Sequence, residues 1–269
     1  MFYEGGANIT MSCVLLSAAS FSFLTKVSYQ YFEKRCAVSA CNSVNDVRSY
    51  VITRTVELTF SLVNFVHALI STLCSSFVLF AMRGYKWTDL TMGRENPLMA
   101  WTVELVCGYL LVELPFLALA KRRLPSSVYE EFLEGYDEMM VFHGVALFGL
   151  LSVLLLDRGF VIGLWVIWTE LTSVFLGLET FFEVRGYNIS MKNAYAVLAV
   201  ITTLAFVLQR CFLFIYLLLL CWTQFHWHAT FVVQFVILIV GSVLNGVFSA
   251  QRCYWTVAWL WSTYAVRHK

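Results

Sequence analysis

The sequence predicts an all-α protein that crosses a membrane several times. Of its 269 residues, 60% are hydrophobic and only 13% are charged, about half the charged share of an ordinary soluble domain. The mean hydropathy is +0.74, and a soluble core of this size could not bury so many apolar side chains. The apolar runs are long and lack the alternation of membrane β-strands, which are about 10 residues long, so helices are expected. A net charge of +1 argues against nucleic acid as a partner.

Seven runs are long and apolar enough to cross a bilayer, which takes about 20 residues. They are Ile9–Leu24, Leu58–Met82, Leu98–Ala120, Met139–Leu156, Phe160–Phe182, Ala194–Trp222 and Ala229–Phe248. Only Asp157-Arg158-Gly159 separates the fourth run from the fifth, and so short a connection forces two antiparallel neighbours. We therefore expect a bundle of six helices preceded by one N-terminal span, which is short and rich in serine.

Composition divides the chain into three parts. Residues 1–47 hold the first span and a basic loop, residues 48–250 hold the six-helix bundle, and residues 251–269 form an aromatic tail suited to the membrane interface. The cysteines contain no Cys-x-x-Cys pair, and His226 and His228 fit an interfacial pair better than a metal site. The sequence therefore indicates no metal and no cofactor.

The distribution of basic residues predicts the orientation. Four lysines and arginines fall on the N-terminal side of the membrane: Arg83, Lys86, Arg94 and Arg158. Thirteen fall on the other side, beginning with Lys26 and ending with Lys269. Because cytosolic loops carry the excess of basic residues, we expect a lumenal or exterior N-terminus and a cytosolic C-terminus. If the first run were not a span, only the N-terminus would change sides.

Seven ionisable residues lie inside the predicted spans, where each costs a few kcal/mol. They are His67, Glu104, Glu113, His143, Glu170, Glu179 and Arg210. So many groups imply a polar cavity between helices, or pairs that neutralise each other. Arg210 with one of the glutamates is the natural pair, and a hydrogen bond between helices is the structural alternative for any single residue.

Spacing refines this inventory. Glu170, Ser173 and Gly177 share one stripe of the fifth span. Pro115, two residues after Glu113, removes a helical hydrogen bond and tends to kink the third span. The sixth run, at 29 residues, must tilt or protrude.

His143 and Glu170 lie at similar depths on either side of the short turn, roughly 21 and 17 Å from it at 1.5 Å per residue. We predict that both side chains point into the bundle, within about 10 Å of each other given those depths, at the wall of an internal cavity.

The order of several short motifs resembles the TLC-domain family, which includes ceramide synthases and the translocating-chain-associated membrane protein. The resemblance runs from about Arg48 to Phe248. Its carriers are Asn64-Phe65-Val66-His67, Gly108-Tyr109-Leu110-Leu111-Val112-Glu113, Phe142-His143, Thr169-Glu170-Leu171-Thr172-Ser173, Arg185-Gly186-Tyr187 and Phe206-Val207-Leu208-Gln209-Arg210. The resemblance implies a six-helix TLC-type bundle with a lumenal N-terminus. It also implies the endoplasmic reticulum membrane, with a mitochondrial membrane as the alternative.

The departures from the synthase pattern bear on function. Ceramide synthases carry a His-His pair and, one helix later, a His-Asp-x-x-Asp run. Here Phe142 replaces one histidine, while Glu170 follows His143 by 27 positions, the spacing between the second histidine and the first aspartate of that pattern. With half of the set missing, the resemblance implies the non-synthase branch, whose members influence membrane lipid composition or traffic, and it favours a protein that is not an enzyme.

Three functions follow from this reasoning. The first is lipid handling, or a role in lipid homeostasis, through a cytosol-facing polar cavity that takes an acyl chain or phospholipid. The candidate cavity residues are His143, Glu170, Ser173, Glu113, His67 and Arg210. The second is a structural accessory subunit of a membrane complex, with membrane-protein partners and its cavity filled by side chains such as Phe142 and Phe175. The third is a lipid N-acyltransferase.

Overall fold

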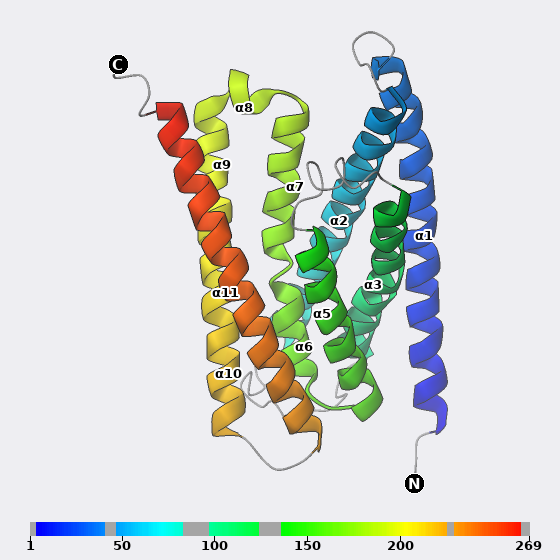
Figure 1. The fold of residues 1–269 in the computed structure, drawn as a ribbon. Helices are drawn as coiled ribbons and strands as arrows, with labels where there is room; N and C mark the ends of the chain where they lie inside the picture. The colour runs from blue at the N-terminus through cyan, green and yellow to red at the C-terminus, as the bar shows by residue number, and fades with distance from the viewer. Residues whose placement is uncertain (1–3, 41–46, 83–96, 124–135, 225–228, 265–269) are drawn as a thin grey trace.

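The computed structural model describes residues 4–40, 47–82, 97–123, 136–224 and 229–264, and the part that it describes is helical (Figure 1). The helices are α1 (Glu4–Ala40), α2 (Val47–Ala81), α3 (Pro97–Arg123), α5 (Tyr136–Leu156), α6 (Phe160–Trp168), α7 (Leu171–Val184), α8 (Tyr187–Ser190), α9 (Lys192–Ala205), η1 (Phe206–Phe212), α10 (Leu213–Thr223) and α11 (Ala229–Tyr264). Seven helical segments of the described chain are long and apolar enough to cross a membrane. The predicted all-α, polytopic fold is confirmed.

The helices form three groups across the bundle. Helix α1 packs on α2 and α3 at one side, and α9, η1, α10 and α11 form the other side, with α5, α6 and α7 between them (Figure 1). The two ends of the chain lie at opposite ends of the bundle. The apolar core connects all three groups: it includes Val103 of α3, Phe160 and Leu164 of α6, and Leu217 of α10, each less than 1% exposed.

The turn between α5 and α6 makes these helices antiparallel neighbours, as the sequence predicts. Asp157 and Gly159 adopt left-handed backbone conformations, with φ angles of 51° and 80°. A side chain at Gly159 would place its Cβ atom 1.8 Å from Nε2 of Gln234, which donates a hydrogen bond to the carbonyl of Arg158 at 3.2 Å. Only glycine lets the turn bend and lets α11 approach it so closely.

The fifth span is not one regular helix but two, α6 and α7, joined at Thr169 and Glu170. The backbone N–H groups of these two residues donate to Val166 and Ile167, three residues back rather than four. The hydroxyl groups of Thr169 and Thr172 also donate to backbone carbonyls, a bonding pattern that competes with regular helix. This break places Glu170 at the start of α7, in the middle of the span.

The sixth span, 192–223, contains a π-helical segment, η1, between two α-helical stretches. Its buried residues are Tyr195, Ala199, Thr202, Phe206, Arg210, Phe214, Leu217 and Cys221. From Thr202 to Phe214 they recur every four residues, so in a straight α-helix of 3.6 residues per turn Phe214 would lie about 120° away from Thr202. The wider turns of η1 absorb this drift and keep one face of the span toward the bundle.

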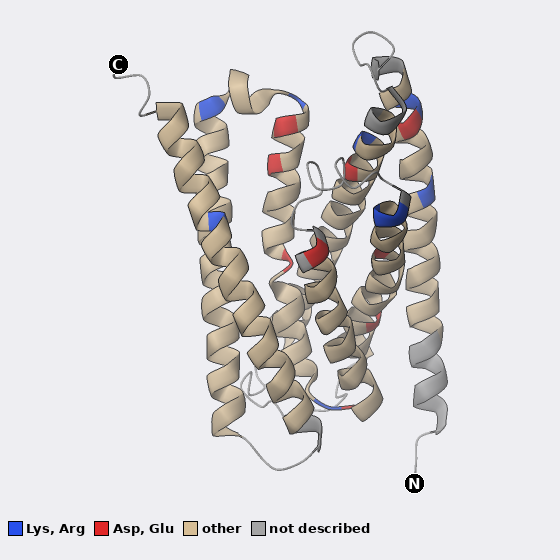
Figure 2. Ribbon diagram, in the orientation of Figure 1, with Lys and Arg blue, Asp and Glu red and all other residues tan. Residues whose placement is uncertain are grey.

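Lysine and arginine gather at the end of the bundle that holds the C-terminus (Figure 2). At this end α11 continues to Tyr264, so residues 251–264 extend the seventh span as helix instead of forming a separate tail. Helix α3 likewise continues through Pro115. His226, His228 and the basic residues Arg83, Lys86 and Arg94 lie outside the described residues.

Candidate functional site

A carboxylate of α3 and an imidazole of α5 meet at the centre of the bundle. Nδ1 of His143 lies 2.5 Å from Oε2 of Glu113, and both side chains are buried, at 7% and 2% exposed. The Tyr109 hydroxyl lies 2.6 Å from the other carboxylate oxygen and 3.2 Å from Oδ1 of Asn64. Since one hydroxyl has one proton to donate, these two acceptors compete for it.

His67 extends this group onto α2. Its ring stacks on Tyr109, with centroids 3.6 Å apart and planes 9° apart, and Nδ1 lies 3.1 Å from the Ser71 hydroxyl. Phe21 of α1 packs edge-on against both rings. We call His67, Tyr109, Glu113 and His143 the histidine group; it joins α2, α3 and α5 and is sealed by α1.

A second group forms around the arginine of η1. Nη2 of Arg210 lies 3.6 Å from Oε1 of Glu170, a partly buried carboxylate, which confirms that this arginine pairs with a glutamate. Nε donates to the Thr172 hydroxyl at 2.6 Å, and Nη2 donates to the Ser173 hydroxyl at 3.1 Å. Ser173 in turn donates to Oε2 of Glu170 at 2.8 Å. We call Glu170, Thr172, Ser173 and Arg210 the arginine group.

The guanidinium of Arg210 is also held between two aromatic rings. Its central carbon lies 5.4 Å from the ring centre of Phe142 and 5.3 Å from that of Phe206. At these distances the ring faces attract the cation, and the attraction is stronger because water is excluded. The residue in place of the synthase histidine therefore contacts the arginine and has no proton to transfer.

A small cavity lies between the two groups, with both polar and apolar side chains in its wall. It measures about 20 Å³, and His67, His143 and Glu170 line it together with Tyr109 and Phe142. A cavity of this size holds about one water molecule. His143 and Glu170 therefore share one wall of a cavity, as predicted, but in this conformation it has no room for an acyl chain.

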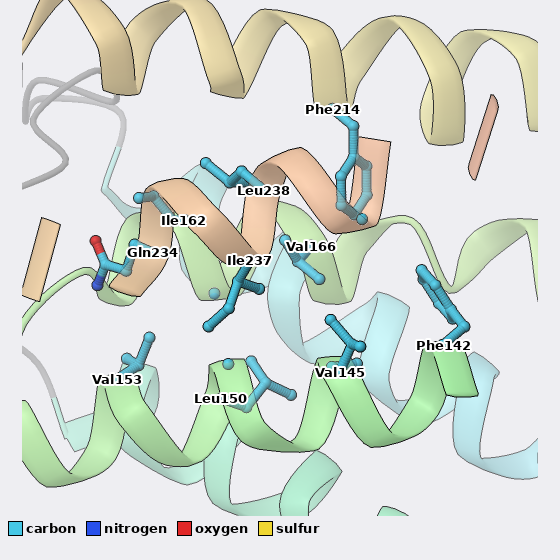
Figure 3. A pocket seen from close by; sticks show the side chains of 14 residues that line it. Phe142, Val145, Leu150, Val153, Ile162, Val166, Phe214, Gln234, Ile237 and Leu238 are labelled. Atoms are coloured by element: carbon cyan, nitrogen blue, oxygen red, sulfur yellow. The ribbon is translucent and has the colours of Figure 1, made fainter. Parts of the chain in front are cut away.

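An apolar cavity of about 40 Å³ adjoins it, between α5, α6, α10 and α11 (Figure 3). Phe142 lies at one end of this cavity and Gln234 at the other. Four side chains line both cavities: Phe142, Ala146, Leu150 and Val166. Nothing in the sequence predicts this second cavity, because its lining is ordinary apolar helix.

The six candidates fall into the two groups. His67, Glu113 and His143 belong to the histidine group, and Glu170, Ser173 and Arg210 belong to the arginine group. Gly177, on the same stripe as Glu170, packs so closely on Phe65 of α2 that a Cβ atom there would lie 2.6 Å from that ring. Whether the six residues bind a lipid stays a prediction.

Sequence reasoning missed several partners. Tyr109 stands one helical turn before Glu113, a spacing that could have paired them, and Thr172 stands beside Ser173 on the predicted stripe. Arg252 forms an ion pair with the buried Glu179 from α11, although the sequence placed that arginine beyond the seventh span. This ion pair could not be predicted because α11 continues as helix to Tyr264, well beyond the predicted end of the seventh span.

The chemistry of the histidine group is that of a proton held between an imidazole and a carboxylate. Such a pair can transfer a proton to a group that reaches it. The arginine group instead presents a fixed cation beside hydroxyl groups, which can hold the oxygens of a polar ligand. Within the part of the chain that the structure describes, no three His, Cys, Asp or Glu side chains are placed to hold a metal ion.

Comparisons with known proteins agree with this architecture. No curated protein and no solved structure matches the chain significantly. The family model of the TLC domain matches residues 52–266, from the start of α2 through the end of α11. Because that match covers well over half of the sequence, the chain belongs to the TLC-domain family.

Proposed function

We propose that this protein binds a membrane lipid at the centre of its bundle, with the polar part between the histidine and arginine groups and an acyl chain in the apolar cavity. The observation that carries the proposal is the shared wall of the two cavities. A cavity lined in part by His67, His143 and Glu170 adjoins a cavity lined almost wholly by apolar side chains, and the two share Phe142 and three aliphatic neighbours. A membrane lipid likewise has a polar headgroup joined to apolar acyl chains.

Phe142 is the side chain that has to move for a lipid to enter. It is 5% exposed, packs edge-on against Phe248 at 6.0 Å and lies over Arg210. With volumes of about 20 and 40 Å³, the separate cavities are too small for an acyl chain. Rotation of the Phe142 ring would join them into one site.

We propose that the core site binds a lipid without catalysing a reaction on it. The imidazole of His143 is held by Glu113, and Phe142 offers no imidazole at the position of the synthase histidine. We place the protein in the non-synthase branch of its family on this ground. We also propose the endoplasmic reticulum membrane on the ground of family membership. The distribution of lysine and arginine supports a lumenal N-terminus (Figure 2).

Removing the dividing ring should increase lipid retention. In the full-length protein purified in mild detergent, Phe142→Ala should carry several times more acyl lipid than the unmodified protein, because it joins the two cavities. Ala146→Phe should carry less, because Ala146 lines both. Mass spectrometry of extracted lipid measures the amount bound.

Phe148→Ala is the matched control, since Phe148 lies on the same helix but is 62% exposed toward the lipid face. It should leave retention unchanged. Equal lipid content in all four proteins, each folded by its thermal transition, would refute a lipid site in the core.

A structural accessory role is the second candidate, and the closed packing around Phe142 favours it. An accessory subunit would keep its membrane-protein partners in every core variant that folds. Affinity purification of Phe142→Ala and Ala146→Phe from membranes therefore separates the two functions: unchanged partners with unchanged lipid would support the accessory role.

A further inference from the structure

A groove opens toward the membrane where α1, α2 and α3 diverge. It measures about 640 Å³, more than ten times the volume of either core cavity. Val56 and Ala120 form its buried floor, with Ile52 and Phe116 packed against them. This apolar floor continues down α3 to Leu111.

Two opposite charges line the groove on one face of α1. Lys26 and Glu33 are seven residues apart, so they lie on the same side of the helix with a rise of roughly 10 Å between them. Both side chains are exposed, and neither is in an ion pair or hydrogen bond with another described residue.

The depth of each charge follows from the packing of α1 on α3. Ser17 donates a hydrogen bond to the carbonyl of Leu105 at 2.8 Å and also contacts Gly108. Since the two helices run in the same direction, Lys26 lies near the level of Phe116 and Glu33 near that of Arg123. Helix α3 ends there in Lys121-Arg122-Arg123, as expected at the lipid headgroups.

Lys26 therefore lies about 10 Å deeper than the end of α3, at 1.5 Å per residue. A lysine at this depth extends its ammonium toward the headgroups, where phosphate is the available anion. Glu33, farther out, faces the outer part of the headgroup. The two charges thus follow the order found in a zwitterionic phospholipid, whose phosphate lies deeper than its amine.

We propose that this groove is a specific site for phosphatidylethanolamine in the leaflet at the C-terminal end of the bundle. Its phosphate binds Lys26, its ammonium donates hydrogen bonds to Glu33, and its acyl chains cover Val112 and Phe116. The primary ammonium is the distinguishing feature, because charge-assisted N–H···O bonds to a carboxylate need N–H groups. A choline headgroup has none, and a glycerol headgroup has no positive charge.

Native mass spectrometry of the full-length protein in detergent tests the site. Phosphatidylethanolamine, phosphatidylcholine and phosphatidylglycerol with identical acyl chains are added, and the apparent Kd of the first bound lipid is measured. We expect phosphatidylethanolamine to bind at least tenfold more tightly than the other two. Lys26→Met should weaken its binding at least tenfold, and Glu33→Gln should abolish its advantage over phosphatidylglycerol.

Two further variants separate a lipid site from simpler explanations. Lys34→Met removes an exposed lysine of the same helix that does not line the groove, and it should change nothing. The double exchange Lys26→Glu with Glu33→Lys keeps the net charge of the groove, but it reverses the order of charges and should not restore binding. Lys26→Arg keeps the cation and should retain most of the affinity.

The proposal is overturned if folded Lys26→Met binds phosphatidylethanolamine as tightly as the unmodified protein, or if phosphatidylglycerol binds equally well to the unmodified groove. The core variant Phe142→Ala should keep the headgroup preference. The experiments therefore distinguish failure of the proposed core site from failure of the proposed groove site.

Discussion

Arg210→Met should destabilise the protein by about 3–5 kcal/mol, the usual cost of removing one partner of a buried ion pair. The change leaves Glu170 in the bundle without its cation and removes the donor to Thr172 and Ser173. The guanidinium is also lost from between the rings of Phe142 and Phe206. A lower midpoint of thermal unfolding in detergent measures the effect.

A second substitution identifies the cause. Arg210→Met combined with Glu170→Gln removes the orphaned charge and should recover most of the loss, since an uncharged pair costs far less to bury. The matched control is Arg54→Met, which breaks the half-exposed pair with Glu57 and should cost less than about 1 kcal/mol. If the single and double variants unfold at the same temperature, the charge of Glu170 is not what Arg210 neutralises.

Deletion of Leu208 should be tolerated, although deletions inside membrane helices usually are not. Leu208 lies within η1 and is 61% exposed. Without it, a regular α-helix brings Thr202, Arg210 and Phe214 within about 20° of one face at 3.6 residues per turn. The midpoint of unfolding should therefore shift by less than about 4 °C, the equivalent of roughly 1 kcal/mol in a chain of this size.

Deletion of Val243 is the matched control. Val243 is 62% exposed, but it lies in α11, where the buried positions already follow the regular helical period. Its loss would turn one half of α11 by about 100° relative to the other and should prevent folding. Equal disruption by both deletions, measured by the yield of monodisperse protein, would show that η1 is not a one-residue insertion.

The sequence predicted the architecture because the spans are mostly apolar over lengths close to that needed to cross a bilayer, and this signal depends on the bilayer and not on tertiary contacts. The connection Asp157-Arg158-Gly159 predicted an antiparallel pair of helices because three residues are too few to cross the membrane again. The pairing of Arg210 with a glutamate was also predictable, since an unpaired cation is costly in a membrane. Which glutamate it pairs with depended on the arrangement of the helices.

The remaining features required coordinates because they depend on contacts between distant residues. The break at Thr169 is marked only by hydroxyl-bearing residues, which also occur in regular membrane helices. The four-residue spacing that produces η1 becomes visible only when buried positions such as Thr202 and Phe214 are known. Neither core cavity could be foreseen, because cavities are set by the fit of apolar side chains.

Helix α3 presents Val112 and Phe116 to the outer groove and Glu113 to His143, within little more than one helical turn. We expect ligands in the groove and in the core to affect each other's binding through this one stretch of backbone. By thermodynamic reciprocity, the factor by which a lipid in the groove changes the affinity of the core equals the factor by which a ligand in the core changes the affinity of the groove. The composition of the surrounding bilayer would then influence binding at the centre of the protein.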